Sequence, residues 1–309
     1  MSIARSLLLR AADSRWLADQ VARRSFTRRA ARRFLPGEAV DAALDAARDF
    51  STRGLGTVLT QLGENVTTPA EAMAVRDHYL DLIEQVAQRG LPTQISVKPT
   101  HLGLDISYDA CLTHLETLAA RAAPSGQPLW IDMEDSRYTD PTLELYRRLR
   151  SSGAHVGVAL QAYLRRTSAD LKRLIALKPV VRLVKGAYNE PPAIAFPAKR
   201  EVDDRFFELG RVLLEHAKQG RAGLVLGTHD LRLVTRLRDE ARRLECPADC
   251  YEVHMLYGIK PRDQQALADA GVRIRVLISY GSAWFRWYMR RLAERPANVW
   301  FVARSLLAP

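Results

Sequence analysis

Eight short apolar runs, each followed by a stretch of helical character, limit most strongly what this chain can fold into. Each run ends in polar residues before the next helical stretch begins. The runs are Thr57–Gln61, Gln94–Lys98, Leu129–Met133, Val156–Gln161, Val181–Lys185, Gly223–Gly227, Tyr251–Met255 and Arg273–Ile278. Between them we expect helices over residues 69–89, 107–122, 141–150, 168–177, 201–218, 231–244 and 261–270.

Strand–helix alternation of this kind predicts right-handed crossovers and a parallel sheet, and therefore an α/β fold. Eight such units predict closure into a (β/α)8 TIM barrel. The 309 residues accommodate a barrel of roughly 250 residues with an extension. An open, doubly wound sheet is the alternative, but it calls for a glycine-rich turn, and no Gly-x-Gly-x-x-Gly motif is present.

The chain divides into a predicted N-terminal helical arm, residues 1–53, and a catalytic barrel, residues 54–309. Residues 1–35 contain nine arginines against Asp13 and Asp19, which is +7 of the formal charge of +11. The basic excess is therefore local, and we expect no nucleic-acid partner. The arm is interpreted as a helix docked on the barrel, with a contact to an anionic membrane surface and a transit peptide as alternatives. The two aspartates count against a transit peptide.

Composition excludes several classes of protein. Apolar residues make up 47% and charged residues 26%, which is typical of a globular chain and excludes global disorder. No window approaches the roughly 18 apolar residues that a membrane span needs. The three cysteines, Cys111, Cys246 and Cys250, cannot form a disulfide framework in a chain this long, so we expect a reducing, cytoplasmic location.

Polar residues stand where the predicted strands end. In a barrel these ends meet at one mouth, where catalytic residues of this fold lie. The residues at or just after the strand ends are Glu64, Lys98, Asp132, Glu134, Gln161, Lys185, His229, Met255, Leu256 and Tyr280. No His-x-His, His-Glu-x-x-His or Gly-x-Ser-x-Gly motif occurs, so we expect neither a metal site nor a serine nucleophile.

Two kinds of chemistry fit this ring of residues. In the first, Lys98 or Lys185 forms a Schiff base with a carbonyl substrate, as in barrel aldolases. In the second, the cations bind an anionic cofactor and an acidic substrate. Arg182, Lys185 and His229 then contact phosphates or a reduced flavin, and Lys98 binds a substrate carboxylate.

The last predicted helix, Trp284–Arg295, bears on this choice. Trp287, Arg290, Arg291 and Glu294 fall at i, i+3, i+4 and i+7, on one face of the helix. One interpretation is an exposed ion-pair face. The other is a helix that crosses the barrel mouth and binds a carboxylate with paired guanidinium groups.

Eight motifs, in order from about residue 36 to the C-terminus, resemble those of the proline dehydrogenases, of the single-function bacterial type. They are Leu62-Gly63-Glu64, Ser96-Val97-Lys98, Ile131-Asp132-Met133-Glu134, Leu160-Gln161-Ala162-Tyr163, Val181-Arg182-Leu183-Val184-Lys185-Gly186-Ala187-Tyr188, Thr228-His229-Asp230, Met255-Leu256-Tyr257-Gly258 and the segment from Arg290 to Asn298.

The resemblance implies a distorted barrel that binds FAD and oxidises L-proline to Δ1-pyrroline-5-carboxylate, the first step of proline catabolism. It implies a membrane quinone as electron acceptor, which suits a basic arm resting on the inner face of the cell membrane. Two alternatives remain: a flavin barrel acting on another cyclic or N-alkyl amino acid, and a Schiff-base barrel lyase.

The resemblance also assigns roles to individual residues. Arg182, near flavin N5, and Asp132, which shapes the site, are the expected catalytic residues, and Glu64 is expected to pair with Arg290 and close the site. The cofactor is expected to contact Met133, Gln161, Arg182, Lys185, Gly186, Ala187, Thr228 and His229. The substrate is expected to contact Lys98, Leu256, Leu277, Trp287, Arg290 and Arg291.

Two positions depart from the family pattern. The family carries a tyrosine where Leu277 stands, in a Tyr-x-Pro-x-Gly motif after the eighth strand, and another where Trp287 stands. Both tyrosines are expected to pack on the substrate ring. The carboxylate contacts are therefore expected to be kept while the pocket that recognises the ring has changed.

Overall fold

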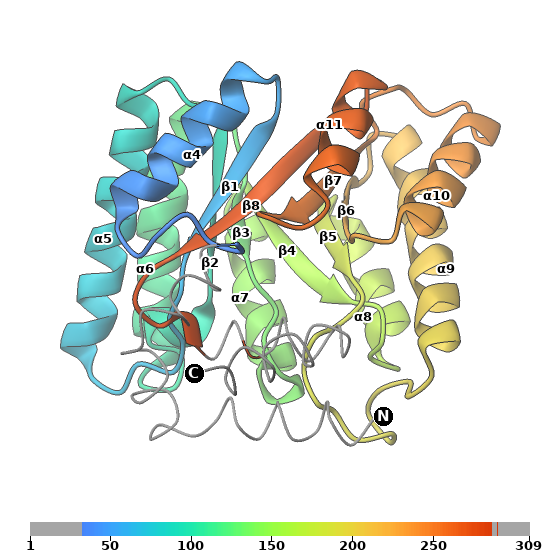
Figure 1. Cartoon of the computed structure of the whole chain (residues 1–309). Coiled ribbons are helices and arrows are strands. Elements are labelled where there is room, and N and C mark those ends of the chain that lie inside the picture. The colour runs from blue at the N-terminus through green and yellow to red at the C-terminus, as the bar shows by residue number, and fades with distance from the viewer. Residues whose placement is uncertain (1–32, 286–288, 290–309) are drawn as a thin grey trace, which may run out of the picture.

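A computed structural model of the chain, which describes residues 33–285 and Met289, contains a closed barrel of eight parallel strands in the order β1 to β8. The helices surround the barrel on its outside (Figure 1). The predicted (β/α)8 fold is therefore confirmed, and the open-sheet alternative is wrong.

The strands and helices agree closely with the predicted segments. The strands are β1 (Gly56–Gln61), β2 (Thr93–Val97), β3 (Leu129–Ile131), β4 (Val156–Gln161), β5 (Val180–Val184), β6 (Gly223–Gly227), β7 (Tyr251–Leu256) and β8 (Ile274–Tyr280). The helices are α4 (Val40–Thr52), α5 (Pro69–Gln88), α6 (Tyr108–Ala122), α7 (Thr139–Ser151), α8 (Thr167–Leu174), α9 (Lys199–Lys218), α10 (Leu231–Arg243) and α11 (Pro261–Asp269). Four short 3₁₀ turns are η1 (Pro99–Leu102), η2 (Ala123–Ser125), η3 (Ser136–Tyr138) and η4 (Ile175–Leu177).

Local capping explains where several helices begin. Thr68 caps α5 in a capping box with Glu71, with Pro69 in the first turn. The hydroxyl of Ser107 accepts a hydrogen bond from a backbone N–H of α6. Asp230 caps α10 in the same way. Since α10 begins where β6 has ended, its capping carboxylate lies at the mouth of the barrel.

Side chains from strands that are not neighbours meet inside the barrel. Ser96 on β2 accepts a hydrogen bond from Arg182 on β5, at 2.9 Å. Trp130 on β3 packs with Val58 on β1 and Val225 on β6 in a small buried cluster. These contacts cross the interior, so the barrel is filled by side chains up to the level of its C-terminal mouth.

Helix α4 packs against β1 and β8. Its buried face includes Leu44 and Phe50, and the Phe50 ring meets the Tyr257 ring edge-on at 6.0 Å. The rest of the predicted arm, residues 1–32, lies outside the described residues, and the domain division after residue 53 stays a prediction. The predicted final helix beyond Phe285, with Trp287, Arg290 and Arg291, lies outside them as well. Among the described residues, no helix is both long and apolar enough to span a membrane.

Candidate active site

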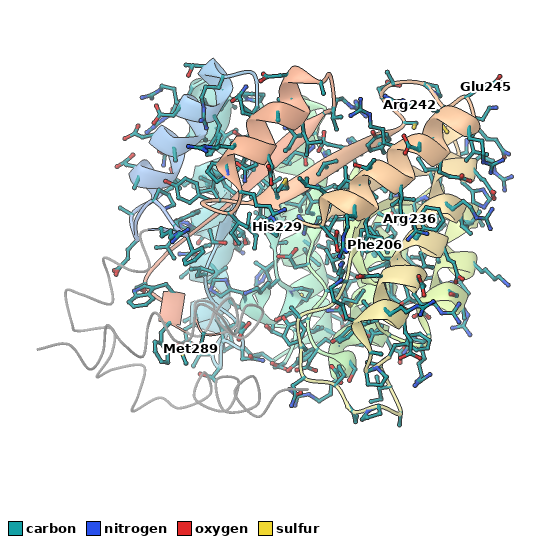
Figure 2. The ribbon with its side chains drawn as sticks, turned by 45° about the vertical axis from the view of Figure 1, so that its right-hand side comes forward. Phe206, His229, Arg236, Arg242, Glu245 and Met289 are labelled. Atoms are coloured by element: carbon teal, nitrogen blue, oxygen red, sulfur yellow. The ribbon has the colours of Figure 1, made fainter. Side chains whose placement is uncertain are left out.

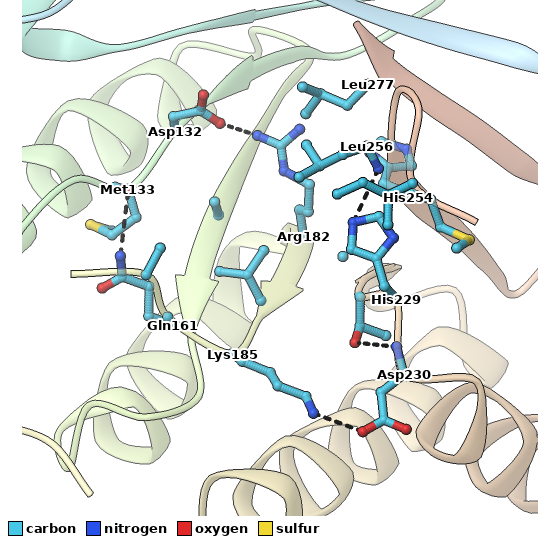
Figure 3. A pocket seen from close by; sticks show the side chains of 18 of the residues that line it. Asp132, Met133, Gln161, Arg182, Lys185, His229, Asp230, His254, Leu256 and Leu277 are labelled. Atoms are coloured by element: carbon cyan, nitrogen blue, oxygen red, sulfur yellow. Dashed lines mark hydrogen bonds and ion pairs between the residues drawn. The ribbon is translucent and has the colours of Figure 1, made fainter. Parts of the chain in front are cut away.

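A cavity of about 1010 Å³ opens at the C-terminal ends of the strands. This is at the upper end of the range for ligand pockets, roughly 300–1,000 Å³. Of the candidate residues, it is lined by Lys98, Asp132, Met133, Gln161, Arg182, Lys185, Gly186, Ala187, Thr228, His229, Leu256 and Leu277. The candidates from all these strands therefore face one space, and Figure 3 shows eight of them around it.

Arg182 lies on the floor of this cavity. Arg182 is only 3% exposed, and its guanidinium forms an ion pair with Asp132. Ser96 Oγ in turn donates a hydrogen bond to Asp132 at 3.0 Å. Burial lowers the pKa of Arg182, and the charge of Asp132 opposes that effect. Asp132 therefore stabilises a buried cation beneath the site (Figure 3).

Lys98 reaches across the mouth toward the loop that follows β1. Its Nζ lies 3.3 Å from the carbonyl oxygen of Gly63, to which it donates, and 3.5 Å from a carboxylate oxygen of Glu64. The side chains of Lys98 and Glu64 are 14% and 12% exposed, so this ion pair is largely buried. Arg290, the predicted partner of Glu64, lies outside the described residues.

Glu134 is a buried carboxyl group, 3% exposed, that joins three of the segments around the mouth. One of its oxygens accepts the Thr100 hydroxyl at 2.6 Å and the other accepts the Thr100 N–H at 3.0 Å. Thr100 follows Lys98, and its hydroxyl accepts a hydrogen bond from the Asn65 N–H at 3.1 Å. Burial raises the pKa of Glu134 to about 7, against the opposing charge of Lys98.

The side-chain amide of Gln161 links the ends of β3 and β4 through hydrogen bonds. Gln161 Nε2 donates to the carbonyl oxygens of Met133 at 3.4 Å and Glu134 at 3.1 Å. This orients the Gln161 side chain, which is 2% exposed. After β5, Gly186 has φ +117, and a Cβ at this position would come within 2.2 Å of the Tyr163 ring. Only glycine fits there, and the backbone can thus border the cavity closely.

Lys185 lies between two carboxylates at the side of the cavity. Its Nζ is 2.5 Å from Asp203 on α9 and 3.0 Å from Asp230, the cap of α10. Lys199 pairs with the same two carboxylates. Burial tends to raise the pKa of Asp230, but the hydrogen bond and charge of Lys185 outweigh it and lower the pKa to about 2. The pKa of Asp203 is lowered as well, so both carboxylates are ionised at neutral pH.

His229 precedes this cap and contacts β7. Its Nε2 accepts a hydrogen bond from the Leu256 N–H at 3.3 Å. His229 borders the cavity just before α10 begins. Arg242 lies in the last turn of that helix and Glu245 just beyond it (Figure 2). Leu277 on β8 and Leu256 on β7 supply an apolar side to the same cavity.

Three groups that contribute to the site were missed from the sequence. Asp203 and Asp230 pair with Lys185, and Trp130 lies against Arg182. Asp230 could have been found, because an aspartate immediately before a predicted helix is a typical N-cap, and this one follows a predicted strand end. Asp203 and Trp130 carry no such signal, since their contacts depend on helix rotation and on packing inside the barrel.

The chemistry of the cavity suits a large anionic cofactor. Among the described residues, Gln161 Oε1 and Arg182 Nη1 are buried polar atoms without a hydrogen-bond partner. A ligand with a polar ring system satisfies such atoms, and Lys185 and Lys199 suit its anionic group. Within the described part of the chain, no three histidine, cysteine, aspartate or glutamate side chains are grouped so that they could bind a metal ion.

Comparison with known proteins gives a consistent result. The family model described as "Proline dehydrogenase" matches residues 43–304. "Proline dehydrogenase 1" of Bacillus subtilis subsp. natto is 37% identical over 281 residues, covering 91% of this chain and 92% of that protein. "Proline dehydrogenase" of Deinococcus radiodurans is 35% identical over 282 residues, covering 90% of each.

Solved structures share the fold. Proline utilization A of Bdellovibrio bacteriovorus, inactivated by N-propargylglycine, matches with a TM-score of 0.79 at 24% identity, over 87% of this chain and 33% of that one. A mutant of the Bradyrhizobium japonicum protein matches with a TM-score of 0.74 at 25% identity, over 90% of this chain and 32% of that one. This chain therefore spans about a third of those longer proteins.

Proposed function

The chain belongs to the proline dehydrogenase family, and from that premise we propose that it oxidises L-proline to Δ1-pyrroline-5-carboxylate with bound FAD and passes the electrons to a quinone. The observation that carries the proposal is the set of polar groups facing one cavity: Arg182 with its Asp132 counterion, Gln161 Oε1 without a hydrogen-bond partner, and Lys185 at the side. These are the groups that the family motifs assign to the flavin.

The residues fit the cofactor. Gln161 Oε1 and Arg182 Nη1 offer an acceptor and a donor to a flavin ring, and Gly186 lets the backbone approach it. Lys185 would bind the pyrophosphate by exchanging one of its carboxylate partners for a phosphate oxygen. Met133, Ala187, Thr228 and His229 complete the assigned set and line the same cavity.

Substrate binding falls to cations and apolar side chains. Lys98 would bind the carboxylate of proline together with Arg290 and Arg291 of the predicted last helix. Three cations on one carboxylate fix the position of the ring, which makes orientation a large part of the rate enhancement. Leu256, Leu277 and Trp287 would enclose the ring.

FAD, when bound, would supply the acceptor for a hydride from C5 of the substrate. The proline amine enters deprotonated, so its lone pair forms the C=N bond as the hydride leaves and no general base is needed. Arg182 stabilises negative charge that develops beside it, because it is a fixed cation in a dry site. Asp132 keeps that guanidinium in place through their ion pair.

Glu64 and the basic arm have roles outside the chemical step. We assign Glu64 to closing the site with Arg290, and its contact with Lys98 supports a position at the mouth. The nine arginines of residues 1–35 would attract the chain to the anionic inner face of the cell membrane, where a quinone is reached.

A second candidate is a related flavin barrel that oxidises another cyclic or N-alkyl amino acid. Leu277 favours it, because this side chain lines the cavity where the family pattern has a tyrosine. The Schiff-base alternative loses support, because Lys185 is engaged by two carboxylates, an arrangement suited to a cation rather than a nucleophile.

A visible absorption spectrum of the purified protein, followed by anaerobic titration, tests the proposal. We expect the two bands of oxidised flavin, and we expect L-proline to bleach them. Bleaching by another cyclic amino acid but not by proline would select the second candidate. A colourless folded protein, or a borohydride-trapped substrate adduct on Lys185, would refute the flavoenzyme.

A further inference from the structure

Arg182 has a third partner besides Asp132 and Ser96. The guanidinium carbon lies 4.9 Å from the centre of the Trp130 ring, within the range of a cation–π contact. Trp130 is on β3 and Arg182 on β5, so this contact crosses the barrel interior rather than running along one ladder. It is fully desolvated, because Trp130 is 0% and Arg182 3% exposed.

The Trp130 ring is held in one orientation from several sides. Its indole N–H donates to Gln94 Oε1 at 2.6 Å. The His254 ring meets it edge-on at 5.5 Å. Gly157, opposite Trp130 on β4, leaves space for it, since a Cβ there would come within 2.5 Å of the indole ring. A ring fixed in this way cannot turn away from the guanidinium.

A hydrogen-bonded network that includes charged side chains surrounds the Trp130 ring. Glu252 accepts hydrogen bonds from His254 at 2.6 Å and from Arg275 at 2.9 Å. Arg275 and Gln94 both donate to Gln127 Oε1, at 3.0 and 2.9 Å. The anchor of the indole N–H is therefore itself fixed, and the network reaches the cavity at His254, which lines it.

We propose that Trp130 is a positioning residue for Arg182, and that its ring face determines how strongly the guanidinium charge is presented to the bound cofactor. The Arg182 Nη2 atom is used by Ser96 and Asp132, which leaves Nη1 for the cavity. The ring covers the guanidinium face, where a buried charge otherwise lacks a partner. This inference rests on the proposed flavin chemistry.

Stepwise fluorination of the indole at position 130 tests the proposal, because fluorine withdraws charge from the ring face with little change in shape. Tryptophan and its mono-, di- and trifluoro analogues are incorporated at this position in the full-length flavin-loaded protein. The readouts are the midpoint potential of the flavin and its rate of anaerobic reduction by proline. We expect both readouts to change monotonically with the number of fluorine atoms. The reduction rate should change about 5- to 30-fold across the series, which corresponds to the strength of a desolvated cation–π contact.

Two controls separate this role from packing. The same analogues at Trp284, which is also buried and whose described ring contact is with Phe285, should leave both readouts constant. Trp130→Phe retains an aromatic face but loses the bond to Gln94. It should keep a potential closer to that of the wild type than Trp130→Leu does.

The outcomes are distinguishable. A yellow protein whose potential and reduction rate are flat across the series would overturn the inference and leave the proposed function intact. A potential that follows fluorination equally at Trp284 would also overturn it. A wild-type protein without flavin would instead refute the proposed function. Since fluorination preserves shape, the series gives an answer even where Trp130→Leu does not fold.

Discussion

Replacing Glu134 with glutamine should remove a pH dependence from the stability of this protein. Glu134 is buried beside Thr100, and burial raises the pKa of its carboxyl group from 4.5 to about 7. In the unfolded chain the group ionises near its ordinary value. Between these two pH values the folded protein binds a proton that the unfolded chain releases. Stability from this group is therefore complete below pH 4.5 and is lost as the pH rises through 7.

The size of the effect follows from the two pKa values. Each unit of pKa difference corresponds to about 1.4 kcal/mol. Part of the proton release from the unfolded chain is complete by pH 5, so the loss between pH 5 and pH 8 is about 2 to 3 kcal/mol. Glutamine has no proton to lose, and its amide can occupy the same place next to Thr100.

Urea unfolding of the wild type and of Glu134→Gln at several values between pH 5 and pH 8 measures the difference. Other titrating groups contribute equally to both proteins and cancel. We expect the wild type to lose stability relative to the variant by the amount above as the pH rises. Glu116→Gln, an exposed substitution on α6, controls for removal of one charge. Parallel curves for wild type and Glu134→Gln would refute the reasoning, and would mean that Lys98 keeps the carboxylate ionised.

Four further predictions concern the site. Arg182→Met should slow flavin reduction about 10- to 1,000-fold and lower the flavin potential, measured by anaerobic stopped flow and redox titration, because a fixed cation is lost. Arg290→Met and Arg291→Met should each raise the KM for proline roughly 30- to 1,000-fold with flavin retained, and unchanged KM values would remove the last helix from the site. The wild type should prefer proline over trans-4-hydroxyproline by about 10- to 100-fold in kcat/KM, and Leu277→Tyr should widen that preference; equal use of both substrates would contradict this. Gly186→Ala should weaken FAD binding in a fluorescence titration, because its Cβ meets a ring at 2.2 Å and its φ is +117.

The barrel could be predicted because each of its units carries its own signal. Val156–Gln161 and Gly223–Gly227 have the predicted bounds, and no other strand boundary differs by more than two residues. The short apolar runs come from strands covered on both faces, and the helices between them start at recognisable caps such as Ser107. The predicted strand of Leu129–Met133 was too long, since β3 ends at Ile131 and polar side chains turn to the mouth.

The pairing inside the site could not be predicted in the same way. Strand ends place Lys185 at the mouth, but its partner Asp203 comes from α9, whose rotation about its own axis is decided by packing. Lys98 was expected to bind the carboxylate of the substrate, and in the described structure it pairs with the carboxylate of Glu64. The periodicity of a sequence predicts which face of a helix or strand is buried, whereas the partner of a side chain depends on how the elements pack against one another.

The arrangement of charges gives the cavity two distinct ends. On its floor, Arg182 is buried with a single carboxylate, so the pair is neutral and its position is fixed by packing. At its side, Lys185 shares two carboxylates with Lys199, and these side chains are 15% to 66% exposed. Arg182 itself is buried, with its side chain 4% exposed, so separating it from Asp132 leaves an uncompensated buried charge, whereas the more exposed lysines exchange partners at little cost. The floor is therefore suited to a reaction that needs a fixed field, and the side to the capture and release of an anionic group.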